Sequence, residues 1–297
     1  MEDHSKRKKP SGCFVTTIEE KLVPKLRHDL EERGFTFSQP PYTHFQAKKA
    51  SLSCSLYLSG KLTVQGAGSE EFIEIVLPSY TYNDASFDPH IGSDETGKGD
   101  FFGPLCVSAV FVNKESLPYL QKLGVKDSKE MNDTRIMAIA KDVETHTINQ
   151  TICLFPETYN RLYARFKNLN KLLGWAHFEV LHKVSLKSHC RKALVDQFAN
   201  PRLMEEIVSY KESSLILEQR TKAESDIAVA AASILARAAF LEGLKKMEED
   251  FSVVLPKGAS SAVANAALKI ARESGTALLD KVSKIHFKTY KETLGRL

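Results

Sequence analysis

Two adjacent acidic residues, Asp94 and Glu95, stand at the end of a predicted strand and directly before a glycine-rich turn. Carboxylate oxygens are the hard ligands that Mg²⁺ and Mn²⁺ prefer in proteins. Because neighbouring side chains on a strand diverge, one carboxylate can face an ion while the other approaches it from the flank. Gly97 and Gly99 allow the backbone amides to come close to a sugar–phosphate chain. The segment therefore favours a metal site beside a phosphate ester, although a polar surface hairpin has the same local pattern.

The same segment matches most of the phosphate-binding loop of nucleoside triphosphatases. The stretch 92–98 reads G-x-x-x-x-G-K, but Gly99 follows where that loop needs the hydroxyl of Ser or Thr to hold magnesium. The loop also needs a helix after it, whereas Pro104 and the β-branched run that follows predict a second strand. Asp94 and Glu95 would, in addition, repel bound phosphates. The sequence therefore argues against binding of a nucleoside triphosphate.

The patterns of apolar residues divide the chain into two predicted domains. Residues 1–77 form the first, with a flexible basic end at 1–14, and residues 78–90 are a turn-rich linker. Residues 91–297 alternate strands and helices, which is typical of an α/β domain with a mixed central sheet. We expect strands in this second domain at 91–94, 105–112, 148–155, 191–196 and 214–218, and helices at 133–145, 168–187, 226–249, 259–274 and 283–294.

The first domain is predicted to be a small α+β unit with helices on one face of a sheet. A helix is expected over 18–34, started by a capping box at Thr16 and Thr17, and a short helix over 69–77. The strands between them alternate apolar and polar positions. The outward face combines small hydroxyls, amides, one aromatic ring and lysines, and its members are Gln46, Lys48, Ser51, Ser53, Ser55, Tyr57, Lys61, Thr63 and Gln65. Such a face suits a sugar–phosphate backbone without base reading, although half-buried sheets commonly present an ordinary polar face to solvent.

Composition and charge limit the classes of protein. The 297 residues are 42% hydrophobic and 26% charged, which excludes disordered and fibrous classes and suffices for two domains. The net charge is +4; residues 1–88 hold 11 basic and 12 acidic side chains, and the remainder holds 30 and 25. This mild excess permits a nucleic-acid partner and belongs to the second domain. No apolar run approaches the roughly 20 residues that span a bilayer, so we expect no membrane association.

The cysteines and the N-terminal end favour a cytoplasmic location. Five widely spaced cysteines form no C-x-x-C pair, which argues against a disulfide framework or a zinc site. The basic residues 6–9 are not followed by an apolar segment, so they do not predict a secretory signal. Cys106, Cys153 and Cys190 are expected to fill the core. His177 has no partner at the spacing of metal ligands, so it is assigned no site.

Several ordered segments resemble the ribonucleases H of types II and III. DETGKGDFFGP at 94–104 is similar to their opening motif, Asp127-Ser128-Lys129 to their D-S-K segment, and TKAES…AAASILAR at 221–237 to their second signature. The acid in that signature is Asp in type II enzymes and Glu in type III enzymes, so Glu224 matches type III. Further segments resemble type III alone: Tyr159-Asn160, NLN at 168–170, WAH at 175–177, LPKGA at 255–259 and KIHF at 284–287.

The resemblance covers about residues 90–290. It implies a ribonuclease H-like mixed-sheet catalytic domain, preceded in type III enzymes by a small TATA-binding-protein-like domain that residues 1–77 match by topology. It also implies a site of four carboxylates for two Mg²⁺ or Mn²⁺ ions. Asp94, Glu95 and Glu224 lie in the motifs, and Asp196, at the end of an apolar strand, is the best third acid. Asp226 competes for that place but is expected to point off the opposite side of a helix start. Without metal the acids would repel one another, so we expect raised carboxylate pKa values.

By resemblance, the chain is a monomeric endonuclease that cuts the RNA strand of RNA–DNA hybrids, leaving 5′-phosphate and 3′-hydroxyl ends. The backbone of Gly97, Lys98 and Gly99 would read 2′-hydroxyls, and Ser128 and Lys129 would contact phosphate.

Two alternatives to hybrid cleavage stay open. Lys98 stands where type III enzymes commonly have Thr and type II enzymes Arg or Lys, so incision at single ribonucleotides in DNA is one of them. A non-catalytic hybrid-binding protein is the other, and the complete acid set argues against it. In the first domain, Ser55, Tyr57 and Lys61 are the candidate substrate contacts.

Overall fold

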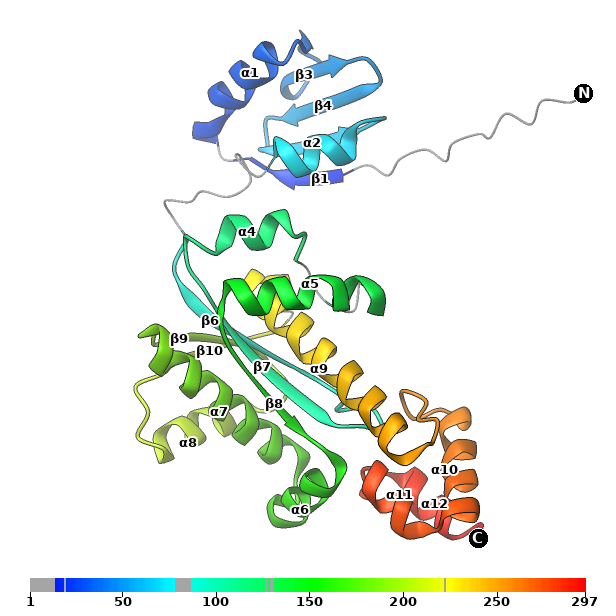
Figure 1. The fold of residues 1–297 in the computed structure, drawn as a ribbon. Helices are drawn as coiled ribbons and strands as arrows, with labels where there is room; N and C mark the ends of the chain where they lie inside the picture. The colour runs from blue at the N-terminus through cyan, green and yellow to red at the C-terminus, as the bar shows by residue number, and fades with distance from the viewer. Residues whose placement is uncertain (1–13, 19, 78–86, 126–127, 129–130, 222) are drawn as a thin grey trace, which may run out of the picture. The chain divides into compact units, whose positions relative to one another are not determined.

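The computed structural model describes residues 14–18, 20–77, 87–125, 128, 131–221 and 223–297. The chain divides into two compact units, Met1–Phe87 and Asp88–Leu297, and each has a hydrophobic core of its own. In Figure 1 the first unit runs from blue to cyan and the second from teal to red. Most of the predicted linker and almost all of the predicted flexible end lie outside the described residues.

The first unit is a five-stranded antiparallel sheet in the order β1-β5-β4-β3-β2. Apolar side chains of its inner face, such as Phe45 and Leu62, pack with Leu26 and Leu30 of the first helix, so the predicted one-sided burial is confirmed. The strands are β1 (Phe14–Thr17), β2 (Thr36–Ser38), β3 (Thr43–Lys49), β4 (Leu52–Tyr57) and β5 (Lys61–Gln65), and the helices are α1 (Val23–Glu32) and α2 (Ser69–Ile75).

The predicted capping box at the start of the first helix is wrong. Thr16 and Thr17 belong to β1, where they lie opposite Leu62 and Lys61 of β5. A short 3-10 turn follows, and α1 begins only at Val23 without a side-chain cap. Pairing with β5 completes an edge of the sheet, and this tertiary gain outweighs a local cap of about 1 kcal/mol.

The second unit is built on a mixed five-stranded sheet in the order β10-β9-β6-β7-β8. The strands β6, β7 and β8 pair antiparallel, whereas β9 runs parallel to β6 and β10 parallel to β9. The five strands predicted from the sequence are confirmed, with ends shifted by one or two residues. They are β6 (His90–Thr96), β7 (Leu105–Val112), β8 (Ile148–Leu154), β9 (Lys192–Asp196) and β10 (Ile216–Arg220).

Helices cover both faces of this sheet (Figure 1). Leu172, Leu173 and Val180 of α7 pack on one face with Ile91 and Val107 of the sheet, and α9 packs on the other. The helices are α4 (Leu117–Lys122), α5 (Asp133–His146), α6 (Pro156–Phe166), α7 (Leu169–Ser188), α8 (Arg202–Tyr210), α9 (Ile227–Phe251), α10 (Ser261–Ser274), α11 (Thr276–Val282) and α12 (Lys288–Leu294). The sequence did not predict α4, α6, α8 or α11.

The helix predicted over 283–294 is shorter than expected. Residue Ser283 forms an isolated antiparallel bridge with Phe102, and the amide of Lys284 donates to the carbonyl of Phe101 at 2.9 Å. This pairing keeps the segment extended, so α12 begins only at Lys288.

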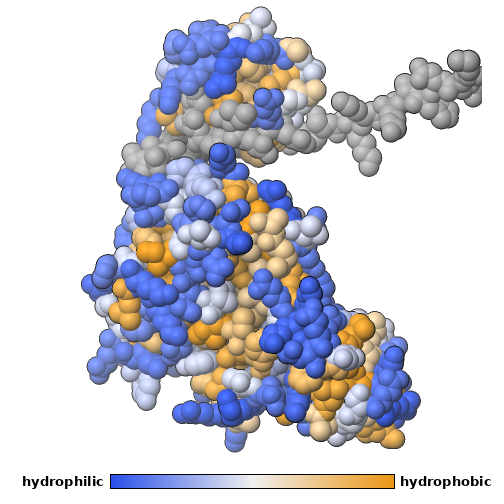
Figure 2. All heavy atoms as spheres, in the orientation of Figure 1, coloured by the Kyte–Doolittle hydropathy of each residue, from blue (hydrophilic) through white to orange (hydrophobic). Residues whose placement is uncertain are grey.

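The alanine-rich helix α9 approaches the sheet closely, as its composition predicts. A Cβ atom on Gly92 of β6 would lie 2.2 Å from the carbonyl carbon of Ala228 and from the amide nitrogen of Val229. Only glycine fits at this crossing. By length and composition alone α9 could cross a membrane, but most of its apolar window is buried inside the unit. In the view of Figure 2, apolar residues show along the course of α9 and hydrophilic ones cover much of the surrounding surface.

Candidate active site

Two of the four predicted acids lie level on neighbouring strands. The parallel register pairs Ser93 of β6 with Val195 of β9, so the next residues, Asp94 and Asp196, stand side by side at the ends of their pairings. Both follow residues whose side chains pack towards α7, because Val195 belongs to the α7-facing core and Ser93 contacts His177 of that helix. Since side chains alternate along a strand, Asp94 and Asp196 face the α9 side of the sheet.

A hydrogen bond places the turn that carries Glu224 at the same end of the sheet, where β6 and β9 finish. Asp196 accepts a hydrogen bond through Oδ1 from the amide of Ala223 at 3.1 Å. Ala223 opens the 3-10 turn Ala223–Ser225, which carries Glu224 and leads directly into α9. Three acids that are up to 130 residues apart in sequence are therefore connected by one sheet pairing and one hydrogen bond.

Asp226, the competing candidate, has a structural role at the start of α9. Its carboxylate accepts from the amides of Ala228 at 2.9 Å and Val229 at 3.2 Å, so it caps the helix. It also lies 3.0 Å from Nε2 of His90. Although burial acts the other way, the His90 bond and charge hold the pKa of Asp226 below its usual value. These contacts favour Asp196 over Asp226 as the third acid.

Glu95 faces the opposite side of β6 from Asp94 and contacts the buried ring of His177. His177 Nε2 lies 3.2 Å from Glu95 Oε2, and Lys98 Nζ lies 3.6 Å from Glu95 Oε1. Burial alone would raise the pKa of Glu95, but the hydrogen bond and charge of His177, together with the charge of Lys98, hold it below the usual value. The expectation of a raised pKa is therefore wrong for Glu95, because its charge is already compensated.

The donor set suits a hard divalent cation, although the side chains do not converge on one point. Within the ranges that the structure describes, no three His, Cys, Asp or Glu side chains are close enough together to hold an ion. Asp94, Asp196 and the turn that carries Glu224 nonetheless lie at the same end of the sheet. They offer only carboxylate oxygens, which fit Mg²⁺ or Mn²⁺.

The turn after β6 is held in place by the C-terminal segment. Gly97 has a φ of +95°, and a Cβ atom there would lie 2.2 Å from the carbonyl oxygen of Pro104, whereas Gly99 is open on all sides. The buried Lys284 donates through Nζ to the carbonyls of Asp100 and Gly103, both at 2.8 Å. The turn is followed by a bend and β7, so the exclusion of a phosphate-binding loop is confirmed.

Sequence reasoning missed Lys284 because it placed this residue inside a predicted helix. The available signal was the KIHF segment, which was recognised only as a resemblance.

Of the D-S-K segment only Ser128 is described. Its amide donates to the hydroxyl of Ser233 on α9 at 2.9 Å, which ties the segment to the helix that follows Glu224. Asp127 and Lys129 lie outside the described residues, so the predicted phosphate contact of Lys129 stays a prediction.

On the first unit, the predicted polar residues do share one face of the sheet, but one of them, Ser55, is buried. Gln46, Ser55 and Thr63 form one cross-strand row. Ser55 is only 7% exposed, and its hydroxyl accepts a hydrogen bond from Gln46 Nε2 at 2.9 Å. Its hydroxyl is thus poorly placed for substrate.

A shallow concavity of about 510 Å³ includes the other two predicted contacts on this unit. Tyr57 and Lys61 line it together with Tyr42, Leu58, Ser59 and Thr63. Tyr42 is 80% exposed and was missed by sequence reasoning, although its position after Pro40 and Pro41 predicts a surface turn. The concavity therefore offers two aromatic rings beside a lysine.

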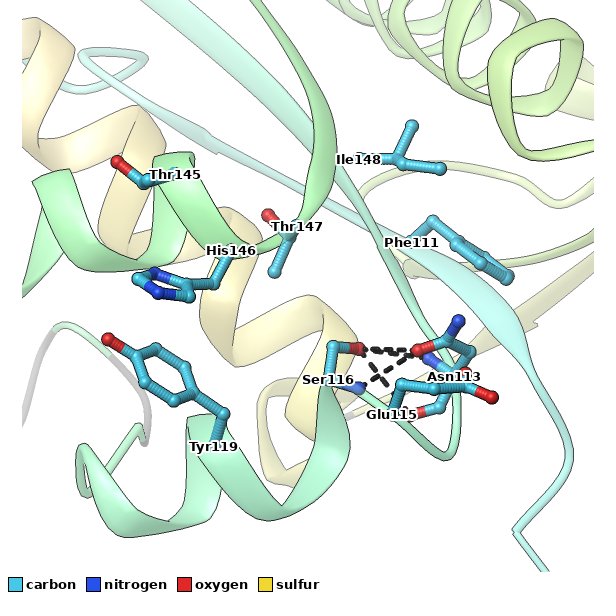
Figure 3. A pocket seen from close by; sticks show the side chains of 9 residues that line it. All are labelled: Phe111, Asn113, Glu115, Ser116, Tyr119, Thr145, His146, Thr147 and Ile148. Carbon is cyan, nitrogen blue, oxygen red and sulfur yellow. Dashed lines mark hydrogen bonds between the residues drawn. The ribbon is translucent and has the colours of Figure 1, made fainter.

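A further open pocket of about 490 Å³ lies on the second unit, away from the acids (Figure 3). It is near Phe111 and Ile148, at the end of the sheet opposite Glu95, since His90 pairs with Val112. Asn113 and Ser116 hydrogen-bond to each other on its wall, and Tyr119 stacks on His146 at 4.0 Å. Thr145, His146 and Thr147 hydrogen-bond to backbone carbonyls of α5, and the pocket contains none of the predicted site residues.

Comparison with known proteins places both units. The family model described as Ribonuclease HII matches residues 91–290, and that of a domain of unknown function, DUF3378, matches residues 13–82. The ribonuclease HIII of Protochlamydia amoebophila is 42% identical over 96% of this chain and 97% of its own length. That of Chlamydia pneumoniae is 45% identical over 94% of this chain and 97% of its own length.

The chain belongs to the ribonuclease HIII family.

A solved ribonuclease HIII has the same architecture as this family member. The crystal structure titled Bst-RNase HIII in complex with Mn²⁺ aligns with a TM-score of 0.68 and 28% identity, covering 96% of this chain and 99% of that one. The predicted fold class and the predicted enzyme class, a ribonuclease H, are therefore confirmed. The separate match of residues 13–82 agrees with a small N-terminal domain in this chain.

Proposed function

We propose that the chain is a divalent-metal-dependent endonuclease that hydrolyses the RNA strand of RNA–DNA hybrids and leaves 5′-phosphate and 3′-hydroxyl ends. The observation that supports this most is the meeting of Asp94, Asp196 and the Glu224 turn at one edge of the sheet. A relative of the same family has been crystallised with Mn²⁺, which supports a divalent ion here. We further propose a monomer that acts in the cytoplasm, in keeping with the cysteine pattern.

The four acids would hold Mg²⁺ or Mn²⁺. When bound, such ions would supply an activated water and neutralise the leaving 3′ oxygen. Asp94 and Asp196 would provide oxygens from the α9 side of the sheet, and Glu95 would approach from the α7 side. Glu224, at the entrance to α9, would complete the set or accept a proton from the attacking water.

Selection of RNA would depend on the backbone of the glycine turn. The open position at Gly99 and the positive φ of Gly97 would let the amides approach a 2′-hydroxyl group, which distinguishes RNA from DNA. The two bonds from Lys284 hold the end of the turn rigid. Ser128 and Lys129 would contact the phosphates beside it.

The concavity on the first unit would increase affinity for the hybrid. Tyr42 and Tyr57 present exposed rings, and Lys61 adds a positive charge. Aromatic and basic side chains of this kind contact sugars and phosphates without reading bases. Catalysis would stay in the second unit, where the acids lie.

The test of the metal chemistry is Asp94→Asn. The variant keeps the size of the side chain but removes one charged ligand, so cleavage of a continuous hybrid should fall at least a thousandfold, on the scale of a lost catalytic group. Hybrid binding, measured by fluorescence anisotropy, should stay within about threefold of wild type because repulsion of phosphate also falls. Asp226→Asn serves as the matched control, since it keeps a capping side chain but removes the charge beside His90, and it should lower stability rather than turnover. Wild-type turnover in Asp94→Asn would contradict the proposal.

Incision at single ribonucleotides in DNA is the second candidate function. The observation that favours it is Lys98, whose ammonium lies 3.6 Å from Glu95 beside the site. Cleavage of a continuous hybrid should be compared with that of a DNA duplex containing one ribonucleotide, first in Mg²⁺ and then in Mn²⁺. Preferred cleavage of the continuous hybrid supports the first function, and preferred incision at the single ribonucleotide supports the second.

A further inference from the structure

His177 of α7 is fully buried, and both of its ring nitrogens have partners on β6. Nδ1 lies 2.6 Å from Ser93 Oγ, and Nε2 lies 3.2 Å from Glu95 Oε2. Ser93 and Glu95 are two residues apart on one strand, so their side chains point to the same face. The imidazole thus connects the buried hydroxyl of Ser93 to the carboxylate of Glu95, one of the four predicted acids.

The two contacts select one tautomer of the imidazole when the ring carries a single hydrogen. An ionised carboxylate can only accept, so Nε2 carries the hydrogen and donates it to Glu95. Nδ1 is then an acceptor, and the hydroxyl of Ser93 donates to it. Ser93 is itself completely buried, so no water competes for this bond.

The plane of the ring is fixed by Phe198. The two rings are parallel to within 14°, with centroids 5.0 Å apart. Phe198 follows the strand-end acid Asp196 by two residues, and its other neighbour is Lys98, whose Nζ lies 5.8 Å from the ring centroid. Rotation of His177 about its side-chain bonds would therefore break a stack and two hydrogen bonds.

The fixed ring of His177 in turn fixes the orientation of the Glu95 carboxylate. Oε2 is held by the imidazole, while Oε1 lies on the side of Lys98, and the carboxylate is 13% exposed. A carboxylate anchored through one oxygen offers the other in a fixed direction. In metalloproteins such outer partners orient the ligands, and their loss costs roughly 10- to 100-fold in metal affinity or activity.

We propose that His177 is a positioning residue that orients the Glu95 carboxylate for a divalent cation, with Ser93 fixing its tautomer and Phe198 its ring plane. The inference rests on the proposed function, because it assigns Glu95 to the metal site. His177 contacts neither the substrate nor the reacting atoms in this arrangement.

The experiment measures Mn²⁺ affinity of the full chain by calorimetry, together with kcat and KM for a continuous hybrid. His177→Leu keeps most of the volume and removes the donor, so Mn²⁺ should bind roughly 10- to 100-fold more weakly. The turnover lost at low Mn²⁺ should return at high Mn²⁺, with KM for the hybrid within about twofold. His177→Gln, which can still donate to Glu95, should recover part of the affinity. His182→Leu, on the same helix and stacked on Phe178 instead, should match wild type.

A double-substitution cycle separates positioning from general stability. Adding His177→Leu to Glu95→Gln should change Mn²⁺ affinity little, because the oriented ligand is already gone. Wild-type Mn²⁺ affinity in folded His177→Leu would overturn the inference while leaving the proposed function intact. If that variant does not fold, unchanged Mn²⁺ affinity in Ser93→Ala, which removes the hydrogen bond to Nδ1 of His177, would overturn it. A wild-type chain that neither binds Mn²⁺ nor cuts hybrids would instead refute the proposed function.

Discussion

One lysine of the second unit, Lys284, is buried among backbone carbonyls. Lys284 has no exposed surface, and burial lowers its pKa to about 7, although Asp100 and Cys106 act in the opposite direction. Its two hydrogen bonds to the carbonyls of Asp100 and Gly103 fix the end of the turn that carries the candidate substrate contacts. The same residue therefore links folding stability to the geometry of the site.

This pKa predicts a distinctive dependence of stability on pH. In the unfolded chain a lysine titrates near 10.4, so between about pH 7 and pH 10 the unfolded state binds a proton that the folded state does not. The contribution of Lys284 to the free energy of unfolding must then rise with pH across this window. Below pH 7 both states are protonated and the full cost of burial is present.

Lys284→Met should remove that dependence. The free energy of unfolding of wild type, measured by urea denaturation at several pH values, should rise relative to the variant by roughly 1 kcal/mol per pH unit between pH 8 and pH 9. The variant also leaves two carbonyls without a donor, which costs about 1–3 kcal/mol each and is independent of pH. Comparison of slopes rather than absolute values isolates the titration, and parallel slopes would contradict it.

Among the elements, the contact between β6 and α9 decides where the acids lie. Asp94 is two residues along the strand from Gly92, the point where the backbone of α9 touches the sheet. The start of the helix is fixed by the cap of Asp226, and Glu224 lies in the turn just before it. The distance between two catalytic candidates therefore depends on how closely one helix can approach one strand.

Gly92→Ala tests this dependence. The added Cβ would lie 2.2 Å from the backbone of Ala228 and Val229, and backbone atoms cannot move aside as a flexible side chain can. We expect a loss of about 3 kcal/mol in the free energy of unfolding, with reduced turnover in the fraction that stays folded. Gly99→Ala is the control, since a Cβ there meets nothing within 4 Å, and its stability should stay within about 0.5 kcal/mol of wild type. Equal stability of the two variants would show that α9 can withdraw without cost.

At the scale of the whole molecule, the chain forms two units with separate cores. The acids and the glycine turn belong to the second unit, while the exposed aromatic rings beside Lys61 belong to the first. Substitutions at a site that only binds substrate should change KM, whereas substitutions at a catalytic site should change kcat.

The joint variant Tyr57→Ala/Lys61→Ala should raise KM for a hybrid about tenfold and leave kcat within twofold. Loss of one stacking ring costs about 1–3 kcal/mol, and loss of one phosphate contact lowers the salt dependence of binding by about one unit of slope. Lys25→Ala on α1 is the control, because α1 covers the opposite, apolar face of the sheet. An unchanged KM and salt slope would rule out the concavity as a substrate contact.

The sequence by itself determined the elements whose signals are local. Patterns of apolar and β-branched residues predicted every strand of the second unit. Alternation predicted the polar face of the first unit, because side-chain direction along a strand has a period of two. The motif at 94–104 identified Asp94 and Glu95, since adjacent acids before a glycine turn need no distant partner to be recognised.

Only the tertiary structure decided which distant residues meet. The sequence already favoured Asp196 over Asp226, but the contacts that separate them, the parallel pairing of β6 with β9 and the cap of α9, are visible only in the structure. His177 lies 82 residues from Glu95 and Lys284 lies 184 residues from Asp100, so no local spacing could reveal either contact. A hydrogen bond between such residues exists only after the chain has folded, because folding alone brings them within about 3 Å.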